Sequence, residues 1–284
     1  MNVLVACEFS GIVRDAFRKR GHSAWSCDLL PTDDASMRRY HIQGDCLDAI
    51  RDGRPTDGAS WDLVIAHPPC TYLCSSGLHW NKRVPGRAEK TEAALAFVRA
   101  ILNADVPHIA LENPVGCIST KIRKYDQKVQ PWQFGHDASK GTCLWLKGLP
   151  PLHHTMIVPP SGWKLVKYAH DCIPCPDCEE PFCEEHGAHY ADCDCIGPMM
   201  DDVATYKTID GYEFATTEQP VRKPVWGNQT PSGQNKLGPS EDRWKERSKT
   251  YSGIATAMAE QWGSLPNVTH EPLPKADNRK DSGQ

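Results

Sequence analysis

A cysteine and a glutamate are the two residues best suited to covalent chemistry. Cys70 ends the run His67-Pro68-Pro69-Cys70, which follows the apolar segment at residues 62–66. Two prolines make this loop stiff, and a thiol held in place can act as a nucleophile. Glu112 follows a second apolar segment, and burial there would raise its pKa so that it could donate a hydrogen bond to a ring nitrogen. Either residue alone fits a structural role, a turn thiol or a capping acid, but the pair indicates a site.

The elements that must position these residues alternate between strands and helices. Buried strands are predicted from apolar runs at residues 2–7, 24–27, 62–66, 108–111 and 142–146. Helical spacing covers residues 12–20, 88–102 and 251–262. We expect Ser10 to cap the first helix and Arg14 to face outward from it. This alternation predicts a doubly wound α/β fold with a mostly parallel sheet, which binds ligands at the carboxyl ends of its strands.

Other strand ends carry residues suited to an adenosine-type ligand. At Phe9-Ser10-Gly11, a glycine lets a ligand approach the backbone, and the following helix N-terminus favours a carboxylate or phosphate. Asp28 ends the second strand, where an acid takes ribose hydroxyls in nucleotide-binding α/β folds. Asp45, in Gly44-Asp45-Cys46, suits an adenine amino group. One glycine is far from a full glycine-rich fingerprint, so an ordinary strand-to-helix turn remains an alternative.

Taken in order, these motifs resemble the DNA cytosine-5 methyltransferase family, in a small divergent form of the kind found in bacteriophage genomes. The motifs that carry the resemblance are Phe9-Ser10-Gly11, Asp28, Gly44-Asp45-Cys46, His67-Pro68-Pro69-Cys70 and Glu112-Asn113-Pro114. Their order and approximate spacing agree over residues 1–150, and the helix predicted at residues 251–262 is similar to the C-terminal helix of the family.

The resemblance implies a Rossmann-like methyltransferase sheet that binds S-adenosylmethionine and methylates a cytosine flipped out of double-stranded DNA. Cys70 is the implied nucleophile on ring carbon six, and Glu112 is the group that hydrogen-bonds the ring. The cofactor-binding residues that it implies are Phe9, Ser10, Gly11, Asp28, Asp45, Cys46 and Pro68. The substrate-binding residues that it implies are Pro69, Asn113 and Lys140.

The sequence departs from the family pattern in three places. The second glycine of the first motif is absent, Thr71 replaces a glutamine after the nucleophile, and residues 133–146 offer Lys140 and Thr142 in place of paired arginines. Alternatives therefore remain. One is an amino-methyltransferase acting on adenine N6 or cytosine N4, which uses a Pro-Pro-aromatic loop. A second is a non-catalytic zinc-bearing DNA-binding protein on a methyltransferase fold, and a third is cytosine-5 transfer from another one-carbon donor or on RNA.

A cysteine-rich insertion forms a second group of possible ligands. Six of the thirteen cysteines lie within residues 172–195. Pairs of cysteines separated by two intervening residues are typical of tetrahedral zinc sites. Residues 170–202 hold ten acids and no Lys or Arg, so a bound cation would favour folding. We predict one or two structural zinc ions, with chance thiols or an iron–sulfur cluster as alternatives. The predicted ligands are Cys172, Cys175, Cys178, Cys183, His186, His189, Cys193 and Cys195.

The chain is predicted to divide into four parts. These are a cofactor-binding catalytic domain at 1–150, a zinc-binding and target-recognition region at 151–250, a returning helix at 251–263 and a disordered tail at 264–284. A basic stretch near the end of the second part is a candidate for phosphate contact, or a solvated helix face. It contains Arg222, Lys223, Lys236, Arg243, Lys245, Arg247 and Lys249, together with Trp226 and Trp244.

Composition limits the class of protein. The 284 residues suffice for one domain with an insertion or for two small domains. A net charge of −4 excludes a basic polyelectrolyte, so DNA binding must come from a local patch. No apolar run approaches the ~20 residues of a membrane helix, and we expect no secretory signal. We therefore expect a cytoplasmic monomer, in the host cell if phage-encoded, without an obligate protein partner and with its cysteines outside disulfides.

Overall fold

The structure is a computed structural model that describes residues 1–166, 173–174, 181–183, 188–189, 205–209, 212–216, 221–229 and 243–265. The chain divides into two compact units. The first holds Met1–Val129, Gly141–Thr155 and Lys249–Gln284, and the second holds Gln130–Lys140 and Met156–Ser248. The predicted zinc ligands lie outside the described residues, except for the strand backbone at Cys183 and His189. Within the described part, no helix is long and apolar enough to cross a membrane.

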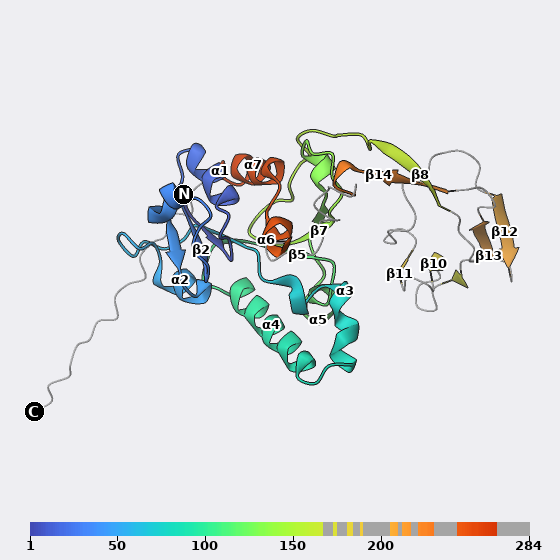
Figure 1. The fold of residues 1–284 in the computed structure, drawn as a ribbon, viewed down its shortest axis with the longest axis horizontal. Helices are drawn as coiled ribbons and strands as arrows, with labels where there is room; N and C mark the ends of the chain where they lie inside the picture. The colour runs from blue at the N-terminus through green and yellow to red at the C-terminus, as the bar shows by residue number, and fades with distance from the viewer. Residues whose placement is uncertain are drawn as a thin grey trace, which may run out of the picture. The chain divides into compact units, whose positions relative to one another are not determined.

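The first unit is built on one seven-stranded sheet with the order β3-β2-β1-β4-β5-β7-β6 (Figure 1). Its strands are β1 Asn2–Ala6, β2 Ser23–Asp28, β3 His41–Gln43, β4 Leu63–Ala66, β5 His108–Pro114, β6 Gln127–Val129 and β7 Thr142–Lys147. Strands β1 to β5 pair in parallel, whereas β7 runs antiparallel to both β5 and β6. The predicted Rossmann-like α/β fold is confirmed.

Helices cover both faces of this sheet (Figure 1). On one face, α1 Ile12–Lys19 packs against α7 Ser252–Gln261, and on the other lie α2 Cys46–Asp52 and α4 Arg87–Leu102. Successive residues of a strand point to opposite faces, and Val3, Leu4, Val5 and Ala6 are all fully buried. Both faces of β1 are therefore core, as expected for a parallel strand between two helix layers.

The remaining elements are short. The first unit also contains η1 Ala35–Tyr40, η2 Cys70–Tyr72, α3 Ser75–Leu78, η3 His79–Lys82 and α5 Ile118–Lys121. The described residues of the second unit form η4 Pro131–Gln133, η6 Gly227–Gln229, α6 Arg243–Ser248 and three small sheets. The strands of these sheets are β8 Gly162–Val166 with β14 Val221–Val225, β12 Thr205–Ile209 with β13 Tyr212–Thr216, and β9 Ile173–Pro174, β10 Pro181–Cys183 and β11 Ala188–His189.

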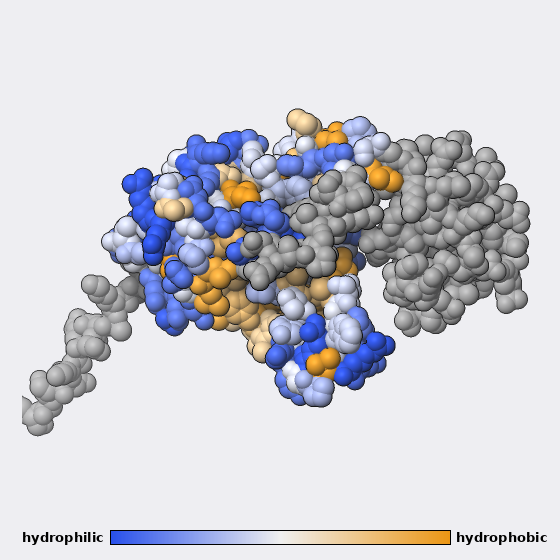
Figure 2. Space-filling view, viewed as in Figure 1, coloured by the Kyte–Doolittle hydropathy of each residue, from blue (hydrophilic) through white to orange (hydrophobic). Residues whose placement is uncertain are grey.

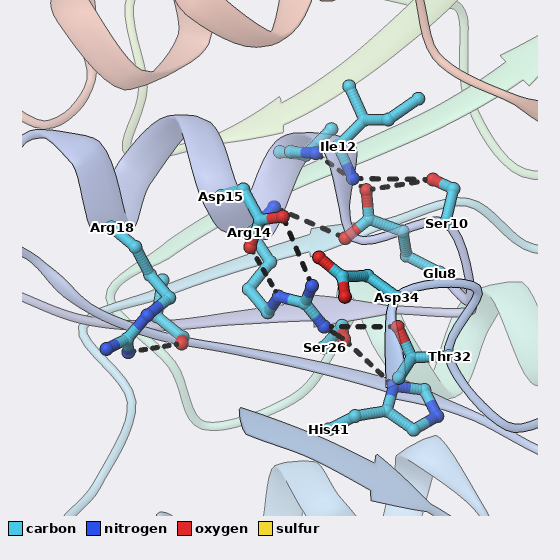
Figure 3. A network of polar contacts seen from close by, with 12 residues as sticks. Glu8, Ser10, Ile12, Arg14, Asp15, Arg18, Ser26, Thr32, Asp34 and His41 are labelled. Carbon is cyan, nitrogen blue, oxygen red and sulfur yellow. Dashed lines mark hydrogen bonds and ion pairs between the residues drawn. The ribbon is translucent and has the colours of Figure 1, made fainter. Parts of the chain in front are cut away.

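The turn from β1 into α1 is closed by a carboxylate of the chain itself. Glu8 is buried and accepts hydrogen bonds from the N–H groups of Val13 (2.7 Å) and Arg14 (3.3 Å), in the first turn of α1 (Figure 3). The N-cap residue is Gly11, with φ of 71° and no side-chain cap. The expectation that Ser10 caps this helix is wrong, because its hydroxyl makes only 3.4 Å contacts. Glu8 instead satisfies these helix N–H groups and complements the helix dipole.

Arg14 is fully buried, which contradicts the expected outward orientation. Its guanidinium donates to Asp15 Oδ1 (2.8 Å), Ser26 Oγ (3.0 Å) and Thr32 Oγ1 (3.4 Å). As Figure 3 shows, this network joins α1 to β2 and to the segment that follows β2. A Cβ atom at Gly11 would lie 2.2 Å from Arg14 Nη2, so a glycine there makes room for the buried cation.

The buried Glu8 carboxyl predicts a pH dependence of stability. Burial raises the pKa of Glu8, and the His67 imidazole and the Val13 and Arg14 N–H groups oppose the shift. A carboxyl with a raised folded-state pKa stabilises the fold below its unfolded pKa of about 4.3. That contribution is lost as pH rises through the folded-state pKa.

In urea unfolding, the free energy of unfolding of Glu8→Gln relative to the unmodified chain should therefore increase from about pH 4 to about pH 7. The control Glu92→Gln replaces an exposed carboxyl, which is hydrated in both states, and should show no such change. A Glu8→Gln difference that stays constant or decreases over this range would contradict the assignment.

Candidate active site

The register of four parallel strands sets four polar residues in one row at the carboxyl edge of the sheet. The strand pairing places four residues side by side: Cys27 of β2, Ala6 of β1, Ala66 of β4 and Leu111 of β5. The residues that follow them are Asp28, Cys7, His67 and Glu112. The strand order reverses between β1 and β4, and doubly wound sheets bind ligands outside the carboxyl ends at such a switch point.

His67 and Glu112 form a side-chain pair in the middle of this edge. His67 Nδ1 lies 3.1 Å from Glu112 Oε2, and the two side chains are 10% and 22% exposed. The electrostatic effect of His67 lowers the pKa of Glu8 and so opposes the effect of burial. The 3.1 Å contact orients the Glu112 carboxyl group. From the sequence, His67 is only the start of a loop, and the strand register supplies its partner.

The Cys70 loop is attached to the segment that follows Glu112. Asn113 is buried, and its side-chain amide donates a 2.7 Å hydrogen bond to the Pro68 carbonyl. Farther along, the Ser75 N–H donates to the Val115 carbonyl (3.0 Å), and the Cys117 N–H donates to the Leu73 carbonyl (2.9 Å). These bonds join the loop after β4 to the end of β5, so the segments carrying the thiol and the carboxyl are held together.

Gly116 makes this attachment possible. A Cβ atom at this position would lie 1.9 Å from the Leu73 carbonyl oxygen and 2.8 Å from the Cys74 Cα. Cys74 and Gly116 form an isolated antiparallel bridge. The two segments therefore pass backbone against backbone, with no room for a side chain at residue 116.

Four of the seven cysteines whose side chains are described, all of them free, are poorly suited to nucleophilic attack. Burial raises the pKa of Cys27 to about 12 and that of Cys143 to about 11. Burial also raises the pKa of Cys117, and a 3.7 Å contact with Cys46 together with burial raises that of Cys7. A raised pKa keeps a thiol protonated. Cys70 is half-buried and follows a strand end at the ligand edge, so it is the best candidate nucleophile.

The acids proposed for an adenosine ligand lie at this same edge. Asp28 is half-buried, burial raises its pKa, and its Oδ1 accepts the Leu30 N–H (2.9 Å). Asp45 is the N-cap of α2, where its Oδ1 accepts the Leu47 N–H (2.8 Å).

The other residues expected to bind the cofactor differ in what they can offer a ligand. Phe9 and Pro68 are buried at strand ends. The Cys46 thiol belongs to the core beside Cys7. The helix N-terminus after Ser10 and Gly11, expected to favour a ligand anion, already receives the Glu8 carboxylate.

Several residues expected to contact a substrate lie elsewhere or are buried. Pro69 is exposed in the Cys70 loop, whereas Lys140 belongs to the second unit, where its Nζ donates to the Arg247 carbonyl (2.8 Å). In the basic stretch, Trp226 is buried and stacks on Trp132 with ring centroids 5.6 Å apart. The side chains of Arg222, Lys223, Lys236, Arg243 and Trp244 lie outside the described part.

Comparisons with protein-family models and with curated proteins find no match. The solved structures similar to this chain include one whose description proposes a DNA modification methyltransferase encoded within a prophage of E. coli. The two share 17% sequence identity with a TM-score of 0.38, and the similar region covers 56% of this chain and 52% of that chain. This chain thus spans about half the length of that protein.

Proposed function

We propose that the protein is a DNA cytosine-5 methyltransferase that uses S-adenosylmethionine and a Cys70 covalent intermediate. The observation that carries this proposal is the junction of two strand ends. Cys70 follows β4, Glu112 lies in β5, and the Asn113–Pro68 hydrogen bond of 2.7 Å joins their segments. A sulfur nucleophile and a carboxyl group are the two groups needed to activate a cytosine ring.

The donor set at the carboxyl edge fits an adenosine cofactor. Asp28 ends β2, as expected of an acid that binds ribose hydroxyls, and Asp45 follows β3 and could accept from the adenine amino group. Phe9 adds an aromatic side chain at the end of β1. Glu8 already accepts hydrogen bonds from N–H groups in the first turn of α1. We therefore give these N–H groups no role in binding the cofactor. When bound, S-adenosylmethionine supplies an electrophilic methyl group.

In the proposed reaction, the Cys70 thiolate forms a bond to C6 of the cytosine, and the electron pair of the C5–C6 double bond moves into the ring. Glu112 donates a hydrogen bond to ring nitrogen three and stabilises the negative charge there. C5 is then the nucleophile and takes the methyl group that bound S-adenosylmethionine would supply, with S-adenosylhomocysteine as the leaving group. Loss of the C5 proton to a base restores the double bond and expels the Cys70 sulfur.

His67 is assigned a positioning role in this reaction. Its Nδ1 contact with Glu112 Oε2 at 3.1 Å fixes the rotation of the carboxyl group that would hydrogen-bond the cytosine. The family uses paired arginines to orient the loop and the base, and this chain lacks a clear match for them. The His67 contact and the Asn113–Pro68 bond can supply part of that orientation.

A mechanism-based trap tests the proposal. With DNA containing 5-fluorocytosine and S-adenosylmethionine, methylated C5 cannot lose its fluorine, so the Cys70–C6 bond persists through denaturation. The native chain should give a shifted band on a denaturing gel, and Cys70→Ser should give none. The matched control is Cys74→Ser, which removes a half-buried thiol four residues away and should retain the adduct.

Absence of an adduct in the native chain, or an adduct that survives Cys70→Ser, would contradict the covalent mechanism. Methylation without an adduct would select the amino-methyltransferase alternative. DNA binding with neither methylation nor an adduct would select the non-catalytic alternative.

We further propose that the cysteine-rich insertion binds one or two zinc ions, supported by the spacing of its eight Cys and His residues. Four protein ligands would close such a site and leave no open position for catalysis. Elemental analysis of the purified protein should therefore find about one or two zinc ions per chain. Cys175→Ser/Cys178→Ser should lower the zinc content while Cys70→Ser leaves it unchanged. A zinc content near zero in the native chain would contradict this proposal.

A further inference from the structure

A second feature of the first unit is a basic segment that begins shortly after Cys70. We call residues 79–90 the basic arm. It comprises η3 His79–Lys82, a turn, and the first turn of α4. In Figure 1 it lies between the label of α3 and the start of α4, away from the sheet. Most of its residues are exposed, including every residue from Lys82 to Gly86.

The charge of the basic arm is opposite to that of the whole chain. It carries Lys82, Arg83, Arg87 and Lys90 against Glu89 alone, whereas the chain has a net charge of −4. No acidic residue occurs between Asp62 and Glu89, a stretch that includes the Cys70 loop. A merely solvated helix face would mix both signs. In Figure 2 this part of the surface is mostly hydrophilic, with a small hydrophobic area.

The basic arm also exposes apolar side chains. Trp80 and Val84 are each 44% exposed. The Trp80 indole packs against the His79 ring at 4.9 Å between centroids, and the Arg83 guanidinium lies 5.9 Å from it. Leu29 and Val115, after β2 and β5, are further exposed apolar residues at the carboxyl edge of the sheet. Cations beside an exposed aromatic ring suit a partner with phosphates and flat bases.

The base of the arm is fixed to the loop that carries Cys70. The Thr91 hydroxyl is buried, donates to the Tyr72 carbonyl (3.1 Å) and accepts from the Asn81 amide (3.0 Å). Arg87 Nη2 donates to the carbonyl of Thr71, the residue after Cys70 (3.0 Å). A partner held by the arm would therefore bind to the same rigid segment as the proposed nucleophile.

We propose that the basic arm binds the backbone of duplex DNA, with Lys82 and Arg83 on phosphates and Trp80 against a sugar or an unstacked base. Arg87 is a positioning residue that connects this contact to the Cys70 loop. This inference rests on the proposed function, since it names the surface that would hold the substrate. It assigns DNA contact to an element other than the basic stretch at residues 222–249.

Binding of a fluorescein-labelled DNA duplex, measured by anisotropy without a methyl donor, tests the inference independently of the reaction. Lys82→Ala/Arg83→Ala should weaken binding and reduce the slope of log affinity against log salt by about 2, one for each lost phosphate contact. Trp80→Ala should weaken binding about tenfold and leave the slope unchanged. All three side chains are exposed, so these variants should fold normally.

The matched control is Lys19→Ala/Lys124→Ala, which also removes two exposed cations and should bind like the unmodified chain. An equal loss in this control would overturn the inference, because it would show that net charge alone governs binding. Unchanged binding by the arm variants would also overturn it while leaving the Cys70 trap unaffected. Absence of duplex binding by the unmodified chain would overturn it as well.

Discussion

The register of the parallel strands is the constraint on which the whole site depends. Because Cys27 of β2, Ala6 of β1, Ala66 of β4 and Leu111 of β5 pair in register, the four residues that come next lie in one row. His67 and Glu112 meet there as a 3.1 Å pair. A shift of one residue between β4 and β5 would turn Glu112 to the opposite face of the sheet. The fully buried residues on both sides of these strands oppose that shift. Packing of the core therefore determines the positions of His67 and Glu112 at the edge.

A second constraint is that polar groups near the edge are mostly satisfied by the chain itself. Glu8 closes the first turn of α1, and Arg14 joins that helix to β2 and the segment after it. Asp45 caps α2 while leaving its carboxylate at the carboxyl edge. These bonds make the strand ends rigid before any ligand arrives, which reduces the ordering that binding would require. In the proposed site, the acids that would bind the cofactor are therefore Asp28 of β2 and Asp45 after β3, and not groups at the start of α1.

Much of this architecture could be predicted from sequence, because continuous apolar runs identify buried parallel strands and the residues after them. This pattern identifies Asp28 and Glu112. Strands β3 and β6 cannot be predicted in this way, because each has only three residues, polar or mixed in character, and shows no hydrophobic pattern. Arg14 was misassigned because a charged residue is normally solvated, and its partners Ser26 and Thr32 come from later in the chain. Predicting the His67–Glu112 pair would require the register of two strands whose paired residues are 45 positions apart. The basic arm is too short to show the helical periodicity by which longer helices are predicted.

The central claim is that a sulfur atom and a carboxyl group at this edge activate carbon five of cytosine. Nucleoside analysis by mass spectrometry tests it most directly, after incubation of the protein with unmethylated DNA and isotopically labelled S-adenosylmethionine. The account predicts label in 5-methyl-2′-deoxycytidine. Label in N4-methyl-2′-deoxycytidine or N6-methyl-2′-deoxyadenosine instead, or no label in DNA, would contradict it.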